Sequence, residues 1–358
     1  MRMRKFDWEK YTSVIGLLLL VTVSVILSDS FLTARNLMNL LRQLAVPGVL
    51  AIGMTFCILT GGIDLSVGGI CALSSVLYAM MLLQGVPFAV AAVILLLMGA
   101  GIGLCYGLLI AKVRIPPFIA TLAGVNATKG AALVITDGAA VGITDSFTLR
   151  LGSESLPVLP STVLLAAAIG AVLYEVYKKR KRSYLVLAAV LGYGMYVAAV
   201  KGGIPYLAVI SVFLNLIFIF VLNHTVFGKN VYAVGGNMDV ARMAGVKIAG
   251  VLVSVYVIES VLGALGGIMT AARLGAGAPT VGTNWELDAI AAVSIGGTSM
   301  SGGSGKLSNT IIGVILIGVL NNMLSLLNVQ TNVQMICKGM IILAAVVLDS
   351  VISRKKLQ

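Results

Sequence analysis

Two carboxylates interrupt strongly apolar stretches of this 358-residue chain. Asp64 lies between two glycine pairs in "LTGGIDLSVGGI" (59–70), and Glu259 lies in "VYVIESVLGALGG" (255–267). An ionisable side chain within a bilayer costs about 2.5–3.5 kcal/mol, so each is a candidate functional group. Asp64 can cap the helix that follows it or contact a substrate, and capping is the favoured interpretation. For Glu259 a role on a pathway and a role in local pairing stay open.

Glycine pairs recur in two distant places. "TGGIDLSVGGI" (60–70) and "IGGTSMSGGSG" (295–305) both place small or polar residues between two glycine pairs. Corresponding interruptions of two membrane helices indicate a transport pathway, although chance similarity also explains the pattern. "IGVLNNMLSLL" (317–327) adds two amides that either hydrogen-bond between helices or line the path. The candidate pathway residues are Gly61, Gly62, Asp64, Ser66, Glu259, Gly296, Gly297, Thr298, Asn321 and Asn322.

A third stretch, "VYAVGGNMDVARMAGVKIAG" (231–250), has the signals of a short surface helix. Asn237 is a good N-cap, Asp239 suits the first turn, and Gly245 suits the C-terminal cap. A helix held between two long apolar segments can insert into a groove on a partner. An ordinary connecting turn is the alternative.

The composition determines the class of protein that carries these groups. Hydrophobic residues make up 59% and charged residues 11% of the chain, compared with roughly 45–50% and about 25% in soluble proteins. Continuous apolar runs of about 20 residues predict transmembrane helices rather than a β-barrel. We therefore expect an all-α polytopic bundle with about ten to twelve membrane segments, some broken by glycine, forming one unit over 1–358. The expected segments are 12–28, 43–60, 65–84, 88–111, 116–135, 158–177, 184–200, 204–223, 248–272, 287–303, 308–328 and 332–352.

The net charge of +12 comes from basic clusters at the ends of apolar runs, at 1–5, 178–182 and 354–356. This distribution is the positive-inside bias of a membrane protein and argues against nucleic-acid binding. It predicts both termini and the loop 223–247 in the cytoplasm, and the loop 136–157 outside.

Catalytic and metal sites are not expected. The four cysteines have no C-x-x-C spacing, and His224 is the only histidine. The stretch "GGSGKLS" (302–308) departs from the G-x-x-x-x-G-K-[ST] phosphate loop at two positions. The chain is therefore expected to bind no ATP, metal or other cofactor itself.

Four collinear stretches together resemble one known family. "AIGMTFCILTGGIDLSVGGICAL" (51–73), "FGKNVYAVGGNMDVARMAGVKI" (227–248), "ELDAIAAVSIGGTSMSGGSG" (286–305) and "VQMICKGMIILAAVVLDS" (333–350) look like the permease subunit of ribose-, xylose- and galactose-type ABC importers. The chain departs from the family in two places. Val240 stands where a small residue, usually alanine, is common. The stretch 174–203 is absent from the shortest ribose-type members and resembles the longer xylose and multiple-sugar branch.

The resemblance implies a function and a set of partners. It implies a homodimer in the bacterial inner membrane that moves a monosaccharide by alternating access, with ATP and Mg²⁺ on a cytoplasmic ATPase subunit. A periplasmic sugar-binding protein would deliver the sugar, and Glu286 and Asp288 would suit its rim or form a solvated helix end. Membrane lipid would surround the bundle. The coupling-loop positions carried over from the resemblance and the adjoining loop are Gly236, Asn237, Asp239, Ala241, Arg242 and Gly245.

Two other functional classes stay open. A proton-coupled secondary transporter would use Glu259 or Asp64, and a channel or membrane scaffold would need neither. Sugars are neutral polyols, so a sugar path needs uncharged hydrogen-bonding groups and aromatic faces.

Overall fold

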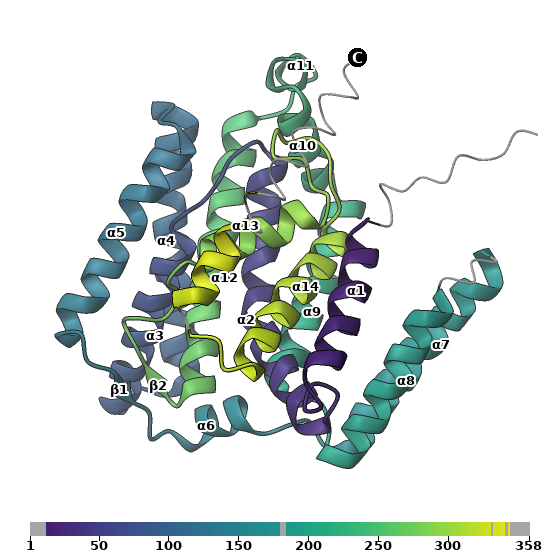
Figure 1. Ribbon diagram of the computed structural model, residues 1–358. Helices are drawn as coiled ribbons and strands as arrows, with labels where there is room; N and C mark the ends of the chain where they lie inside the picture. Colours follow the sequence, from purple (N-terminus) through teal and green to yellow (C-terminus); the bar gives the residue numbers. More distant parts are fainter. Residues whose placement is uncertain (1–11, 180–183, 331, 341–342, 344–358) are drawn as a thin grey trace, which may run out of the picture.

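The computed structural model describes residues 12–179, 184–330, 332–340 and 343, and most of these residues are helical (Figure 1). One antiparallel pair of two-residue strands joins Val141–Gly142 (β1) to Ala276–Gly277 (β2). The helices are α1 (Thr12–Leu27), α2 (Ala34–Leu59), α3 (Val67–Leu83), α4 (Phe88–Leu108) with a π-helical turn η2 (Leu109–Val113), α5 (Pro117–Thr136), α6 (Ser146–Ser153), α7 (Val158–Lys179), α8 (Tyr184–Lys201), α9 (Tyr206–His224), α10 (Val226–Gly236), α11 (Met238–Met243), α12 (Ile248–Leu274), α13 (Trp285–Ile295) and α14 (Leu307–Leu326).

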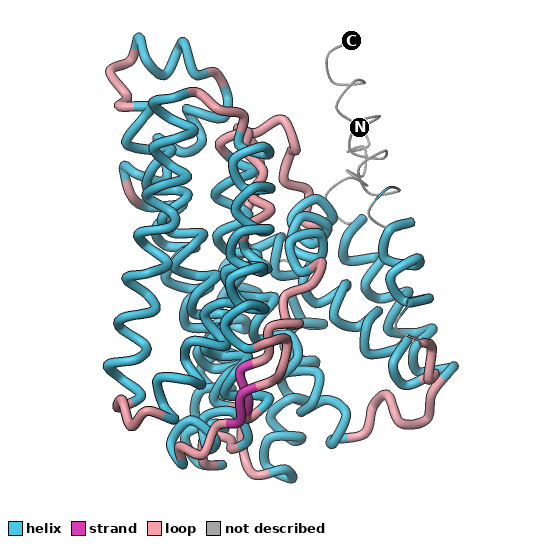
Figure 2. Tube along the Cα trace, turned by 90° about the vertical axis from the view of Figure 1, so that its left-hand side faces the viewer, coloured by secondary structure: helices cyan, strands magenta, loops and turns pink. Residues whose placement is uncertain are grey.

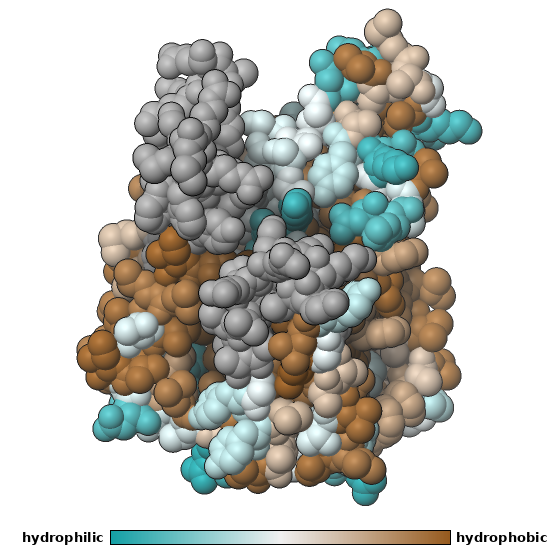
Figure 3. Space-filling model, turned by 90° about the vertical axis from the view of Figure 1, so that its right-hand side faces the viewer, coloured by the Kyte–Doolittle hydropathy of each residue, from teal (hydrophilic) through white to brown (hydrophobic). Residues whose placement is uncertain are grey.

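The length and composition of these helices confirm a polytopic α-helical membrane bundle. In the described part of the chain, 6 helices are long and apolar enough to cross a membrane, and α1, α3 and α7 add shorter apolar helices. Exposed apolar side chains cover much of the middle and lower surface, whereas hydrophilic residues gather at the upper right and along the lower edge (Figure 3). A surface of this kind is stable in contact with lipid tails rather than water.

Several predicted boundaries agree with the structure, and two do not. The predicted segments 65–84 and 116–135 are confirmed as α3 and α5. The segment predicted to start at 43 starts at Ala34, because Thr33 accepts a hydrogen bond from the Asn36 N–H and caps two polar turns. The segment 287–303 was wrongly predicted to be a full crossing.

The helix in that segment is much shorter. Helix α13 has 11 residues, which span only about 16 Å of a hydrocarbon core about 30 Å thick. It ends at Ile295, where Gly296 and Gly297 follow and Gly297 has φ +81°. The rest of the predicted segment has no helix up to Leu307, so the chain crosses this region as a half-helix followed by an irregular loop.

Both predicted loops contain secondary structure that the sequence did not reveal. The stretch 136–157 contains β1 and α6, and 223–247 contains α10 before the expected short helix α11. The predicted segment 332–352 and the basic clusters that fixed the termini lie mostly outside the described residues.

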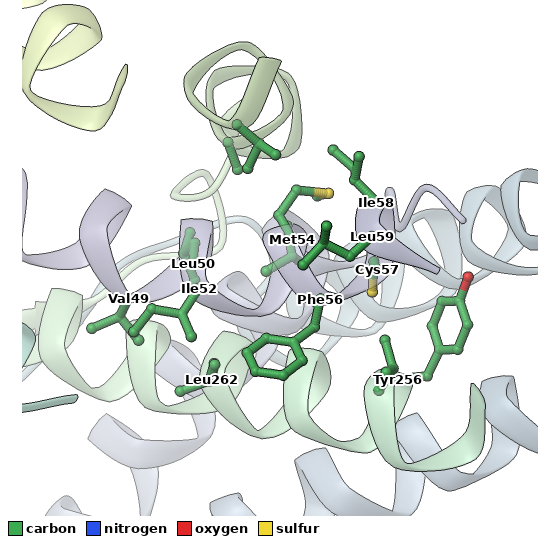
Figure 4. Close-up of a cluster of buried hydrophobic side chains, with 14 of the residues drawn as sticks. Val49, Leu50, Ile52, Met54, Phe56, Cys57, Ile58, Leu59, Tyr256 and Leu262 are labelled. Carbon is green, nitrogen blue, oxygen red and sulfur yellow. The ribbon is translucent and has the colours of Figure 1, made fainter. Parts of the chain in front are cut away.

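Helices α2 and α12 form the centre of the bundle. The second half of α2, from Val49 to Leu59, is buried, and its side chains pack beside Tyr256 and Leu262 of α12 (Figure 4). On its other side, α12 packs against α4 through glycines spaced four apart, Gly99, Gly103 and Gly107. A Cβ at Gly99 would lie 2.7 Å from the Ser260 carbonyl oxygen. Small residues at this spacing let membrane helices approach closely.

The inserted segment forms a helical hairpin beside the bundle. Helices α7 and α8 pack on each other and stand apart from the other helices in Figure 1. Val197 of α8 and Met38 of α2 share a small apolar cluster where the hairpin joins the bundle. In Figures 1 and 2, α11 and the β1–β2 pair lie at opposite ends of the molecule, hereafter the α11 end and the β end.

Candidate functional site

The first glycine-rich stretch forms an extended break inside the protein between α2 and α3. Gly62 packs against the hydroxyl of Tyr256, while Val67 at the start of α3 packs against Gly263. Tyr256 and Gly263 are two turns apart on α12, so the chain rises about 10 Å along α12 without helical hydrogen bonds. Irregular backbone at this depth is tolerated only where protein or a polar cavity surrounds it.

Two side chains accept hydrogen bonds from backbone N–H groups of this break. Asp64 Oδ1 accepts from the Ser66 N–H at 2.7 Å and from the Ser66 hydroxyl at 2.6 Å. Thr121 of α5 accepts from the Leu65 N–H at 3.1 Å. The sequence predicts that Asp64 bonds the free N–H groups of α3, but its side chain instead accepts from Ser66, the N-cap residue. Asp64 therefore supports the break that precedes the helix, and the contribution of Thr121 has no signal in the sequence.

The second glycine-rich stretch lies directly against the first. The Gly303 N–H donates to the Leu59 carbonyl oxygen at 2.9 Å. A Cβ at Gly302 would lie 2.9 Å from the Gly61 nitrogen. Gly302 and Gly303 have φ +86° and +73°, a region that favours glycine. The two stretches that resemble each other in sequence are thus in contact in the fold.

A third glycine pair, at the end of α10, completes this contact. A Cβ at Gly235 would lie 2.7 Å from the Gly303 nitrogen and would overlap the Leu59 carbonyl oxygen. Tyr232 of α10 donates from its hydroxyl to the Gly305 carbonyl oxygen at 2.9 Å. We call the meeting of 59–62, 235–236 and 302–303 the glycine junction. It joins the segment that carries α11 to both breaks in the bundle.

Helix α11 has a defined cap at each end, as predicted. The Asn237 side chain accepts from the N–H groups of Asp239 and Val240 at 3.0 Å each. At the other end Gly245, with φ +82°, donates to the Arg242 carbonyl oxygen, and Val246 donates to that of Ala241. These two bonds form a Schellman motif, which stops the helix after two turns.

The exposed surface of α11 combines three apolar side chains with one ion pair. Met243 is 90% exposed, Val240 61% and Met238 42%. Asp239 and Arg242 form an exposed ion pair at 3.0 Å, and Ala241 is buried. The residues singled out from the sequence therefore shape the helix, whereas Met243 and its neighbours form the surface that a partner can contact.

Glu259 lies in the core beside Gly53 of α2. Its side chain is fully buried, and among the described residues neither carboxylate oxygen has a hydrogen-bond partner. Gly53 has no side chain, and this leaves the space that the carboxylate occupies.

Gly296, which follows α13, makes a close helix contact, since a Cβ there would lie 2.8 Å from the Thr310 Cα. Thr298 is fully buried in the turn after α13.

The two neighbouring amides of α14 have different surroundings. Asn322 exchanges two 2.9 Å hydrogen bonds with Asn36 of α2, in the interhelical pairing that the sequence left open. Asn321 faces a cavity between α2, α13 and α14.

Asp288, at the start of α13, pairs with Lys338 at 2.8 Å, and only 14% of its side chain is exposed. Asp288 is therefore not a freely solvated helix end.

Comparison with known proteins shows clear relatives. Residues 36–346 match the model of the family described as branched-chain amino acid transport system / permease component. The ribose import permease protein RbsC of Bacillus subtilis (strain 168) is 40% identical over 341 residues, which cover 95% of this chain and 92% of the relative. The xylose transport system permease protein XylH of Haemophilus influenzae is 34% identical over 373 residues, which cover 99% of each chain. No solved structure matches.

Proposed function

Because the chain belongs to the family of branched-chain amino acid transport system permease components, we propose that it is the membrane subunit of an ATP-driven importer for a monosaccharide. The choice of a monosaccharide is supported by the relatives named for ribose and xylose import, which align with nearly the whole chain. The substrate would be a pentose or a hexose.

The observation that carries this proposal is the outward face of α11. A two-turn helix with a cap at each end holds Met243 and Val240 in the open, at the tip of an apolar bundle. Exposed apolar side chains on a rigid helix are suited to a groove on another protein. That protein would be the ATPase subunit, which would bind ATP and Mg²⁺, so that this chain needs no cofactor of its own.

Docking of the ATPase on α11 would fix the orientation of the chain in the membrane. The α11 end and both termini would lie in the cytoplasm, and the β end would face a periplasmic sugar-binding protein. Two copies of the chain would form the transmembrane dimer, with the sugar passing by alternating access. The glycine junction would transmit movement of α11 to the breaks at 60–66 and 296–306, since all three meet through backbone contacts.

A proton-coupled secondary transporter is the second candidate. The fully buried Glu259 carboxylate, which has no hydrogen-bond partner among the described residues, favours it. A buried carboxylate without a partner is the kind of group that exchanges a proton during transport. Asp64 is less suited to that chemistry, because Ser66 donates two hydrogen bonds to its Oδ1, although its Oδ2 is also buried without a partner among the described residues.

The ATPase activity of the assembled complex tests the proposal. The tagged chain is co-expressed with the ATPase subunit of its own transport system, purified, and placed in nanodiscs. We expect the two to co-purify, and we expect binding protein plus sugar to stimulate ATP hydrolysis. If the chain purifies without any ATPase subunit but still transports sugar, the importer proposal is wrong.

A further inference from the structure

A cavity with a mixed apolar and polar lining lies in the half of the bundle nearer the β end. It has a volume of about 170 Å³ and is bounded by α2, the end of α12, α13, α14 and the segment 332–340. Its polar lining comes from Gln43, Arg273, Trp285, Asp288, Asn321 and Lys338. Of these residues, the sequence singled out Asn321 as a candidate for the pathway and Asp288 as a candidate for the rim that meets the binding protein.

The lining offers the two kinds of group that a sugar ring needs. Trp285 presents a large aromatic ring, on which the C–H face of a sugar can pack. Gln43 and Asn321 present amides, which both donate and accept hydrogen bonds. The buried Asn321 Oδ1 has no hydrogen-bond partner among the described residues. A buried acceptor without a donor is costly, and a ligand hydroxyl placed in the cavity would supply one.

The charged groups of the lining are compatible with a neutral ligand. Asp288 and Lys338 form a 2.8 Å ion pair whose side chains are 14% and 23% exposed. This pair neutralises the one carboxylate of the lining and connects the segment 332–340 to α13. Arg273 adds guanidinium donors, which suit hydroxyl oxygens as well as anions.

The volume limits the size of the ligand. Pockets for drug-sized molecules hold roughly 300–1,000 Å³, whereas this cavity holds about 170 Å³, the volume of about six water molecules. A single five- or six-carbon sugar is of that order, and a disaccharide is not.

We propose that this cavity is the position inside the permease where one monosaccharide ring rests, stacked on Trp285 and hydrogen-bonded to Asn321 and Gln43. The proposal rests on the importer function proposed above and adds the residues that contact the sugar. Trp285 and Asn321 contribute to selectivity for the sugar, because Trp285 packs against the apolar face of the ring and Asn321 hydrogen-bonds to a hydroxyl. A single ring fills the cavity volume, so the second ring of a disaccharide would have to lie outside it.

The chain provides its own reporter for this site. It has two tryptophans, so the Trp8→Phe variant leaves Trp285 as the sole indole. This variant, full-length and in nanodiscs, is titrated with ribose, xylose, glucose and the disaccharide maltose while tryptophan fluorescence is recorded. We expect a saturable change with at least one monosaccharide and none with maltose at the same concentrations.

Single substitutions test the two hydrogen-bond contacts proposed for the sugar. In the Trp8→Phe background, Asn321→Leu or Gln43→Leu should raise the half-saturating concentration about tenfold, the effect of one lost hydrogen bond. Asn126→Leu is the matched control, because the Asn126 side chain is exposed on α5 and donates only to the Leu122 carbonyl oxygen. It should leave the titration unchanged.

The outcomes separate this proposal from the importer function. If ATP-driven uptake is intact but no monosaccharide changes the fluorescence of Trp285, the cavity is not the resting position. The same holds if maltose gives the same saturation, or if both leucine variants titrate as the parent does. If sugar saturates the signal but uptake does not depend on ATP, the cavity proposal stands and the importer function fails.

Discussion

The Gly303 N–H donates a 2.9 Å hydrogen bond to the carbonyl oxygen of Leu59. This bond joins the C-terminus of α2 to the loop after α13, which are more than 240 residues apart in the sequence. Gly235 at the end of α10 packs on the same carbonyl, so no side chain separates the three backbones. We therefore expect a displacement of α10 and α11 to act directly on both breaks in the bundle.

Adding one methyl group at this junction should uncouple α11 from the bundle. In Gly235→Ala the new Cβ would overlap the Leu59 carbonyl, and backbone atoms must shift to admit it. Overpacking of this kind costs about 1–3 kcal/mol, so we expect ATP-driven sugar uptake to fall roughly tenfold or more at equal protein level. Uptake of labelled sugar into proteoliposomes measures this.

The neighbouring glycine is the control. Nothing lies within 4 Å of a Cβ built on Gly236. Gly236 belongs to the junction only through its backbone, so Gly236→Ala leaves those contacts in place and should transport at close to the normal rate. Equal rates for the two alanine variants would show that the junction does not transmit the motion of α11.

A charge on the outward face of α11 should prevent docking of the ATPase. Met243 is 90% exposed, so Met243→Asp leaves the core intact but places a carboxylate in an apolar contact. We expect at least about tenfold less ATPase subunit to co-purify, corresponding to about 1.4 kcal/mol. Met243→Leu keeps the apolar contact and should co-purify normally. Undiminished recovery of the ATPase with Met243→Asp would refute the docking surface.

Asp64 should act through its hydrogen bonds rather than through its charge. Asp64→Ala removes the acceptor for the Ser66 N–H and hydroxyl, at a cost of about 1–3 kcal/mol. Asp64→Asn keeps an acceptor oxygen in the same place. In thermal unfolding of the purified protein, we expect the alanine variant to lose more stability than the asparagine variant, and we expect the asparagine variant to keep ATP-driven uptake. An asparagine variant that is stable yet inactive would instead indicate proton chemistry at this carboxylate.

The Asn36–Asn322 pair should contribute to stability and not to sugar recognition. Either single alanine variant leaves a buried amide without its partner, which costs about 1–3 kcal/mol. The double variant should lose less than the sum of the two single losses, because the pair interacts directly. Thermal unfolding of the unmodified protein, the two single variants and the double variant gives the interaction free energy of the pair. A KM for sugar that changes in Asn322→Ala while stability does not would contradict this assignment.

Local signals in the sequence were enough to predict some elements. The two ends of α11 could be predicted from Asn237 and Gly245, because capping depends on residues within one turn of the helix end. The helices α3 and α5 were predicted closely because their apolar runs end at glycine or proline signals. The early start of α2 was missed, since Arg35, Asn36 and Asn39 give its first turns no apolar pattern.

The contacts between distant segments could not be predicted in this way. Nothing near Leu59 indicates that its carbonyl meets Gly303, and nothing near Leu65 indicates that Thr121 accepts its N–H. The cavity at Trp285 could not be predicted either, because its lining comes from separate elements that only the packing of α2, α13 and α14 brings together. Sequence similarity singled out the two glycine-rich stretches without showing that they touch.

Uptake into proteoliposomes tests the central claim most directly. The chain, its ATPase subunit and its binding protein are reconstituted, and accumulation of labelled ribose and xylose is followed with and without ATP on the ATPase side. The account predicts accumulation that requires ATP and the binding protein and that persists when an ionophore collapses the proton gradient. Accumulation that proceeds without ATP and stops with the ionophore would contradict it and would assign transport to a proton-coupled carboxylate such as Glu259.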